Sequence, residues 1–209
     1  MVFLITVIAY AAIITGAILH PSENNLATWI IWMMLSSTFL YAQIKEGHAG
    51  WQMALGYLIG NVAMLFIAWF VGDYTFNLGP AESIALFGFI GAVVVWTIIG
   101  ITTKKWDSRL LYFGSVLADL ASFYPMWKQY ITAHEAISTV GLIGWIGFFI
   151  GAFVNAVWVE HCVYKFMLSP SAYRETYGVK KRALRIVEES LLSLEVLFSV
   201  GSTLTLIVI

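Results

Sequence analysis

Seven apolar stretches, each close to 20 residues long, constrain the fold of this chain more than any other feature. They cover residues 1–19, 26–44, 51–72, 82–102, 109–128, 138–159 and 190–209. A helix of about 20 apolar residues crosses a hydrocarbon core of ~30 Å, because each residue adds ~1.5 Å. We therefore predict an all-α integral membrane protein with seven transmembrane helices, in contact with the lipid bilayer.

The composition agrees with a surface that faces lipid. Hydrophobic residues make up 60% of the sequence and charged residues only 11%, whereas a soluble domain carries about 25% charged residues. The net charge of −1 argues against a nucleic-acid partner, which favours a clustered basic surface. Cys162 is the one cysteine, so an intramolecular disulfide and a multi-cysteine zinc site are excluded.

The basic residues predict the orientation of the helices. With seven crossings, ten of the eleven Lys and Arg residues fall on the side that holds the N-terminus, and Lys128 alone falls on the other. Cytoplasmic loops attract Lys and Arg. We therefore expect a cytoplasmic N-terminus and an extracytoplasmic C-terminus. The ten residues are Lys45, Lys104, Lys105, Arg109, Lys165, Arg174, Lys180, Lys181, Arg182 and Arg185.

Two acidic residues lie inside the apolar stretches. Asp119 is near the middle of the fifth stretch, and Glu195 is in the cytoplasmic third of the seventh. A charged group at this depth is costly and usually faces a cavity or a partner. Each is either a proton-coupling or substrate-binding acid, or a neutral structural carboxyl. We predict that Asp119 faces the interior, near a polar group of the second or sixth helix such as Ser36, Ser37 or Asn155.

Four further side chains at depth are candidates for binding a solute. Asn61 and Asn155 can hydrogen-bond between helices or contact a solute. Trp32 and Trp145 lie deeper than the other tryptophans considered and could line a pocket. Tryptophans near helix ends are instead typical of a membrane-interface belt. These are Trp29, Trp51, Trp106 and Trp127.

Glycines spaced four residues apart mark one face of two predicted helices. Gly56 and Gly60 precede Asn61 in the third, and Gly147 and Gly151 precede Asn155 in the sixth. Such a face lets a neighbouring backbone or a ligand approach closely. Close helix packing is slightly favoured over a ligand here.

The sequence carries no recognisable catalytic or metal-binding cluster. Its four histidines show no H-x-x-x-H or H-x-x-E-H spacing, whereas a metal site needs three or four converging ligands. We also find no phosphate-binding glycine loop, no nucleophile elbow and no dinucleotide motif. We therefore expect no enzymatic activity, no catalytic residues, no metal and no cofactor.

Two blocks of the chain share a layout. In residues 19–42 and again in residues 131–155, a helix end is followed by a short polar loop with His and Glu, and then by a helix that carries Trp. We predict a 3+1+3 architecture of two parallel triplets, in which helices one to three (1–72) repeat as helices five to seven (109–209). The helix over 82–102 is then the linker. Repeats of this kind are common in transporters, with the solute site at the repeat interface.

The stretch from Leu117 to Tyr130, with Pro125 and Lys128, followed by Ser138, resembles the PQ-loop motif. That motif belongs to the SWEET sugar transporters, their half-size relatives and cystine-type carriers, and bacterial vitamin transporters have a similar architecture. The resemblance implies that Pro125 is a hinge. We also predict that Tyr124 beside it contacts the solute. The sequence departs from the motif at Met126, where the family has Gln. It also lacks a proline in its first helix, and its predicted orientation is opposite to that of the sugar transporters.

Together these features predict a small-solute membrane transporter, passive or proton-coupled, with its site near the midplane between the triplets. Sugars, amino acids and vitamins are the solute classes expected. The alternative is a non-transporting subunit or scaffold of a larger membrane complex, and both a homo-oligomer and such a complex stay open. A retinal protein would need a lysine in its last helix, which residues 191–209 lack. A polar midplane cavity that touches Asp119 or Asn155 would favour transport.

Overall fold

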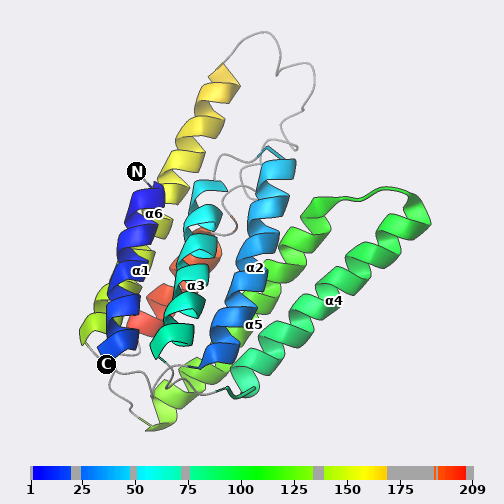
Figure 1. The fold of residues 1–209 in the computed structure, drawn as a ribbon. Helices are drawn as coiled ribbons and strands as arrows, with labels where there is room; N and C mark the ends of the chain where they lie inside the picture. The colour runs from blue at the N-terminus through cyan, green and yellow to red at the C-terminus, as the bar shows by residue number, and fades with distance from the viewer. Residues whose placement is uncertain are drawn as a thin grey trace.

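The computed structural model describes residues 2–19, 25–47, 51–71, 76–133, 139–168, 191 and 193–205. These residues form seven helices that run alternately up and down a bundle (Figure 1). Six are α1 (Val2–Leu19), α2 (Leu26–Lys45), α3 (Trp51–Val71), α4 (Pro80–Thr103), α5 (Ser108–Ala133) and α6 (Thr139–Leu168). The seventh, over 193–205, is called the C-terminal helix below. Within these described ranges the chain is all-helical and has seven helices, as predicted.

Two helices extend at least five residues beyond the C-terminal bounds that the sequence predicts. α5 continues to Ala133 instead of ending at 128, and α6 continues to Leu168 instead of ending at 159. Residues 160–168, which lie between the sixth and seventh apolar stretches, are therefore helical. The far end of α6 projects beyond the ends of its neighbours (Figure 1). Hydropathy marks where a segment stops being apolar, and a helix can continue into water past that point.

Local chemistry fixes where several helices begin and end. Asn25 has extended backbone angles, and its side chain accepts a hydrogen bond from the amide of Ala27, so it caps the N-terminus of α2. Pro80 begins α4, at a position where its missing N–H costs nothing. The same helix ends at Thr103, and the C-cap residue Lys104 has a left-handed φ of 55°. The carboxylate of Asp107 then accepts from the amide of Arg109 in the first turn of α5.

The packing order of the helices differs from their order in the chain. α3 lies between α1 and α2 and contacts both. α1 also packs against α6, and α2 packs against α5. α4 lies at the outer edge of the bundle beside α5 (Figure 1). The C-terminal helix is tied to α6 through Asn155 and Ser193, and to α5 through Trp127 and Thr203.

The glycine faces of α3 and α6 both receive α1. A Cβ on Gly60 would lie 2.1 Å from the ring of Tyr10, and a Cβ on Gly147 would lie 2.8 Å from the Cβ of Ala9. Both distances are too short for two side chains. Helix packing therefore accounts for these glycines, and no ligand is needed to explain them.

The outer surface of the bundle is strongly apolar. Trp69 is 84% exposed and Phe70 is 82% exposed. α4 buries only Ala85, Phe89 and Gly100. Among the described residues, three helices are long and apolar enough to cross a membrane, over Leu26–Lys45, Trp51–Phe70 and Pro80–Thr103. This surface fits a membrane protein, because lipid solvates exposed apolar side chains that water would not.

Candidate functional site

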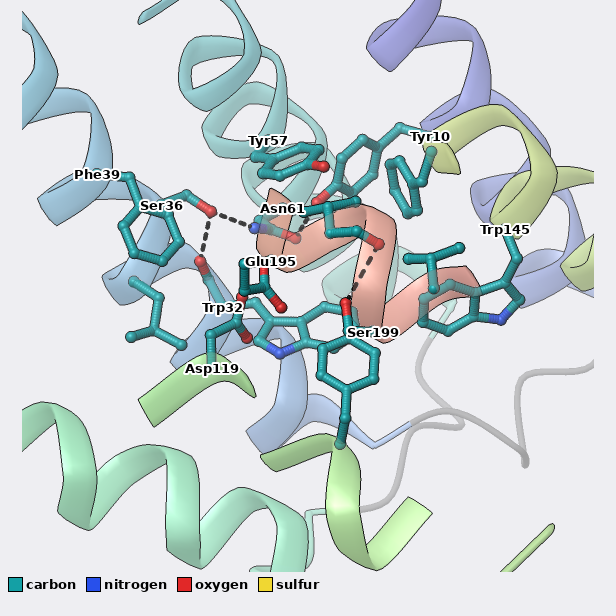
Figure 2. A pocket seen from close by; sticks show the side chains of 15 residues that line it. Tyr10, Trp32, Ser36, Phe39, Tyr57, Asn61, Asp119, Trp145, Glu195 and Ser199 are labelled. Atoms are coloured by element: carbon teal, nitrogen blue, oxygen red, sulfur yellow. Dashed lines mark hydrogen bonds between the residues drawn. The ribbon is translucent and has the colours of Figure 1, made fainter. Parts of the chain in front are cut away.

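A cavity lies inside the bundle and is lined by residues from six of the seven helices (Figure 2). α4 contributes none of its lining residues. The cavity has a volume of about 50 Å³, several times the ~10–15 Å³ that one water molecule requires. It is therefore large enough for several waters or a small solute.

The cavity lining is aromatic and acidic. Seven of its fifteen residues are aromatic, five are polar and three are aliphatic. Two of the polar residues, Asp119 and Glu195, carry carboxyl groups, and none of the fifteen is Lys, Arg or His. The aromatic residues are Tyr10, Trp32, Phe39, Tyr57, Phe123, Trp145 and Phe148.

Edge-to-face contacts hold the aromatic wall together around Phe148. Its ring centre lies 4.9 Å from that of Tyr10, 5.5 Å from that of Tyr57 and 6.2 Å from that of Trp145, at steep interplanar angles. Trp32 is held in the same way by Trp29, with ring centres 5.4 Å apart. Edge-to-face pairs are favourable beyond the area that they bury. The wall is therefore a preformed surface with fixed ring orientations.

A chain of hydrogen bonds links α1, α3 and α2 at one side of the cavity. The hydroxyl of Tyr10 donates to Oδ1 of Asn61 at 2.7 Å, and Nδ2 of Asn61 donates to Oγ of Ser36 at 2.8 Å. Ser36 in turn donates to the carbonyl of Trp32 at 2.6 Å. The principal polar groups on this side are thus already engaged with one another (Figure 2).

The two acids approach the cavity from different helices. Asp119 on α5 is partly exposed, while Glu195 on the C-terminal helix is only 4% exposed. Figure 2 shows both side chains directed toward the same space, and they are close enough to interact electrostatically. Neither carboxyl oxygen of Glu195 has a hydrogen-bond partner among the described residues.

Ser199 lies one helical turn after Glu195. Its hydroxyl donates to the carbonyl of Val196 at 3.4 Å, a long hydrogen bond. Ser199 also lines the cavity, on the same helix as Glu195.

The structure brings most of the predicted site residues together. Trp32, Asn61, Asp119, Trp145 and Glu195 all line the cavity. Asp119 lines the cavity together with a polar residue of the second helix, Ser36. Ser37, by contrast, is exposed on the other side of α2.

Two predicted residues do not line the cavity. Tyr124 is 65% exposed on the outside of α5, because five residues after Asp119 correspond to a rotation of about 140° around a helix. Asn155 is buried but donates to Oγ of Ser193 at 2.8 Å, so it joins α6 to the C-terminal helix. Trp29, expected in an interface belt, is buried against Trp32.

The cavity also contains residues that the sequence analysis did not select. Most of them follow or precede a selected residue by three or four positions, which places them on the same helix face. Tyr57 precedes Asn61 by four, Phe123 follows Asp119 by four, and Phe148 follows Trp145 by three. A search along the helix face of each selected residue would have found them. Tyr10 has no selected residue three or four positions away. Only the packing of its ring against Gly60 identifies it as part of the site.

The PQ-loop-like segment lies in the second half of α5. This helix runs without interruption from Ser108 to Ala133, so Pro125 does not end it. Trp127 donates its indole N–H to Oγ1 of Thr203 at 3.0 Å, which fixes this part of α5 against the C-terminal helix. Ser138 lies outside the described residues. The role of Pro125 as a hinge stays a prediction.

Within the described ranges, no group of three or more His, Cys, Asp or Glu side chains could hold a metal ion. His20, His48 and His134 lie outside those ranges. No family model, curated protein or solved structure matches the chain. The cavity itself is therefore the basis for any functional assignment.

Proposed function

We propose that the chain crosses the membrane seven times in a 3+1+3 arrangement and carries a small solute through the cavity between its two triplets. In this arrangement α1, α2 and α3 form one triplet, and α5, α6 and the C-terminal helix form the other. α4 is the linker.

The packing order supports two related triplets. A two-fold axis that exchanges α1 with α5 and α2 with α6 would convert the α1–α6 contact into an α5–α2 contact, and both contacts are present. Transporters built from parallel repeats have such an axis along the membrane normal. The absence of α4 residues from the cavity lining fits its role as a linker.

The buried acids supply the single observation that carries the proposal. Glu195 is held in an apolar bundle with no hydrogen-bond partner among the described residues, beside Asp119 and a cavity. A structural role would favour a satisfied or apolar residue, because an unpaired buried carboxyl destabilises the fold. Ionisable groups inside membrane proteins commonly mark solute and proton pathways.

The charge distribution supports a cytoplasmic N-terminus. Lys45, Lys104, Lys105 and Arg109 all lie at one end of the bundle, where α2 and α4 end and α5 begins. The ammonium of Lys45 donates to the carbonyl of Trp106 at 2.8 Å, which ties two of these loops together. Under the positive-inside rule this end faces the cytoplasm.

The resemblance to the PQ-loop family agrees with this proposal in helix count and in the position of the site between triplets. The family motif near Pro125 would make α5 the element that bends. The class of solute does not carry over from the family.

Uptake into reconstituted vesicles tests the proposal. We expect full-length protein to accumulate or equilibrate a small solute, and we expect uptake to depend on pH if a proton moves with it. Asp119→Asn should keep the fold, since an amide still hydrogen-bonds, and should abolish the pH dependence.

Asp107→Asn is the matched control, because Asp107 lies in a loop outside the cavity and Asn also caps helices well. This variant should transport like the original protein. Failure of every solute class to enter the vesicles would contradict transport and favour a scaffold. Unchanged pH dependence in Asp119→Asn would reject proton coupling through this residue.

A further inference from the structure

The cavity lining also indicates which chemical class of solute it accepts, if the proposed transport function holds. We propose that the solute is a small monovalent organic cation of the amine or ammonium class. Asp119 and Glu195 would be its counter-ions, and the aromatic wall would contact its alkyl groups.

The charges of the cavity lining favour a cation. The fifteen lining residues include two acids and no base. Two neighbouring carboxyls in a low-dielectric site cannot both ionise easily, and one retained proton leaves a single negative charge. None of the fifteen lining residues brings a positive charge that would neutralise this negative charge. A bound monovalent cation would neutralise it, whereas an anion would be repelled.

The aromatic wall favours an organic cation. Ammonium groups with alkyl substituents are weakly hydrated, and they are attracted to the faces of Trp, Tyr and Phe rings. Trp32 and Trp145 lie on α2 and α6, in opposite triplets, so a cation between them could contact a ring of each. A hard metal cation would instead need about six oxygen ligands, and this lining is mostly carbon.

The hydrogen-bonding groups argue against a sugar. A sugar presents many hydroxyl groups, each of which needs a partner when it leaves water. Tyr10, Asn61 and Ser36 are already bonded to one another. The carboxyl of Glu195 is a strong acceptor without a donor among the described residues, and an N–H of an ammonium group is the donor that it lacks.

The volume limits the size of the cation. A space of about 50 Å³ suits a methylated ammonium ion better than a long polyamine or a nucleoside. An amino acid would also bring a carboxylate into a cavity without a basic residue.

Cation binding should compete with protons. The cation needs one ionised carboxyl, while the other acid of the pair keeps its proton. At low pH a second proton occupies the first carboxyl as well and must leave for solvent before the cation binds, so affinity rises with pH. The other titratable groups that face the cavity are the hydroxyls of Tyr10 from α1 and Tyr57 from α3; α2 and α6 contribute none to the lining. With one proton displaced per cation, affinity falls by up to ~tenfold for each unit of pH below the titration of the pair.

Calorimetric titration of the full-length protein in lipid nanodiscs tests this inference. The probes are methylammonium and trimethylammonium chloride, with NaCl and KCl at equal ionic strength, glucose and glycine as comparisons. We expect saturable binding of at least one ammonium ion, no saturable binding of the comparison solutes, and proton release on binding. Glu195→Gln and Asp119→Asn should each weaken binding at least tenfold, and Asp107→Asn should leave it unchanged.

A ring substitution separates cation–π contact from simple packing. Trp32→Phe keeps a ring and should bind the ammonium ion better than Trp32→Leu by about three- to tenfold. Equal affinity in both variants would remove Trp32 from the site. If Glu195→Gln does not fold, Asp119→Asn gives the same test from the other acid.

The outcomes distinguish this inference from the transport proposal. Uptake of a sugar or an amino acid without competition by ammonium ions would overturn the solute class while leaving transport intact. Saturable ammonium binding without uptake would support the class and overturn transport. Equal binding of Na⁺ or K⁺ would overturn the organic-cation inference.

Discussion

At the scale of single residues, a few close contacts set the shape of the cavity. Tyr10 reaches Asn61 only because Gly60 leaves room for its ring. Phe148 then packs edge-on against Tyr10 and Tyr57. One glycine therefore determines whether the hydrogen-bonded chain and the aromatic wall can form together.

Gly60→Ala tests this dependence. The added Cβ would lie 2.1 Å from the Tyr10 ring, so the ring must move and its hydrogen bond to Asn61 must break. We expect a loss of about 1–3 kcal/mol in the free energy of unfolding, which is typical of overpacking. Thermal unfolding of the detergent-solubilised protein would measure it. Gly91→Ala is the matched control, because a Cβ there meets nothing within 4 Å; equal stability of the two variants would contradict the prediction.

At the scale of helices, the sequence predicted well which helices exist and in which order they follow along the chain. It predicted the residues at which they end less accurately. α2 and α3 begin and end within one residue of the expected bounds, because polar residues and glycines flank clean apolar runs. α6 passes Glu160, His161 and Lys165 without stopping. These polar residues interrupt the apolar stretch, but they are compatible with a helix. Hydropathy alone could therefore not predict the residue at which α6 ends.

The sequence predicted the polar residues of the candidate site better than the aromatic ones. Asp119, Glu195 and Asn61 stand out in apolar stretches and all line the cavity. Of the seven aromatic members, only Trp32 and Trp145 stood out, because of their depth. The other five did not, since aromatic residues make up 16% of the chain and most serve packing. Tyr10 and Phe148 could be recognised only once α1 was seen to pack between the glycine faces of α3 and α6.

The position of Pro125 inside α5 predicts that this helix can bend. A proline inside a helix removes one backbone hydrogen bond, here to the carbonyl of Ala121, and crowds that carbonyl. If α5 bends there during transport, Pro125→Ala should slow uptake several-fold while raising the stability of the protein. Uptake rates and thermal unfolding of the same preparation would measure both. Faster or unchanged uptake in the more stable variant would exclude a hinge at this position.

At the scale of the whole molecule, the bundle has two chemically different ends. One end carries Lys45, Lys104, Lys105 and Arg109. At the other end, Asn25 at the start of α2 bonds to Asn77 and to Glu82 near the start of α4. The basic residues of the first end suit a cytoplasmic surface. At the second end, Asn25, Asn77 and Glu82 form a polar junction that contains no lysine or arginine.

Single-cysteine labelling tests this orientation. Cys162 is the only cysteine, so Cys162→Ser gives a cysteine-free background. We expect Lys105→Cys to react with a membrane-impermeant thiol reagent from the cytoplasmic side and Asn77→Cys from the opposite side; both positions are exposed. Reaction of both from the same side would contradict an odd number of crossings between them.

Transport through this site requires a cavity that opens alternately to the two sides of the membrane. In the same background, Ser36→Cys and Ser199→Cys place a thiol in the cavity lining. The direct measurement is their reaction with a small cationic methanethiosulfonate reagent, added from each side of vesicles in which the protein has a uniform orientation. We predict that both thiols react from either side, while Lys105→Cys reacts from one side only. Thiols that react from only one side, or from neither, would contradict transport through this cavity.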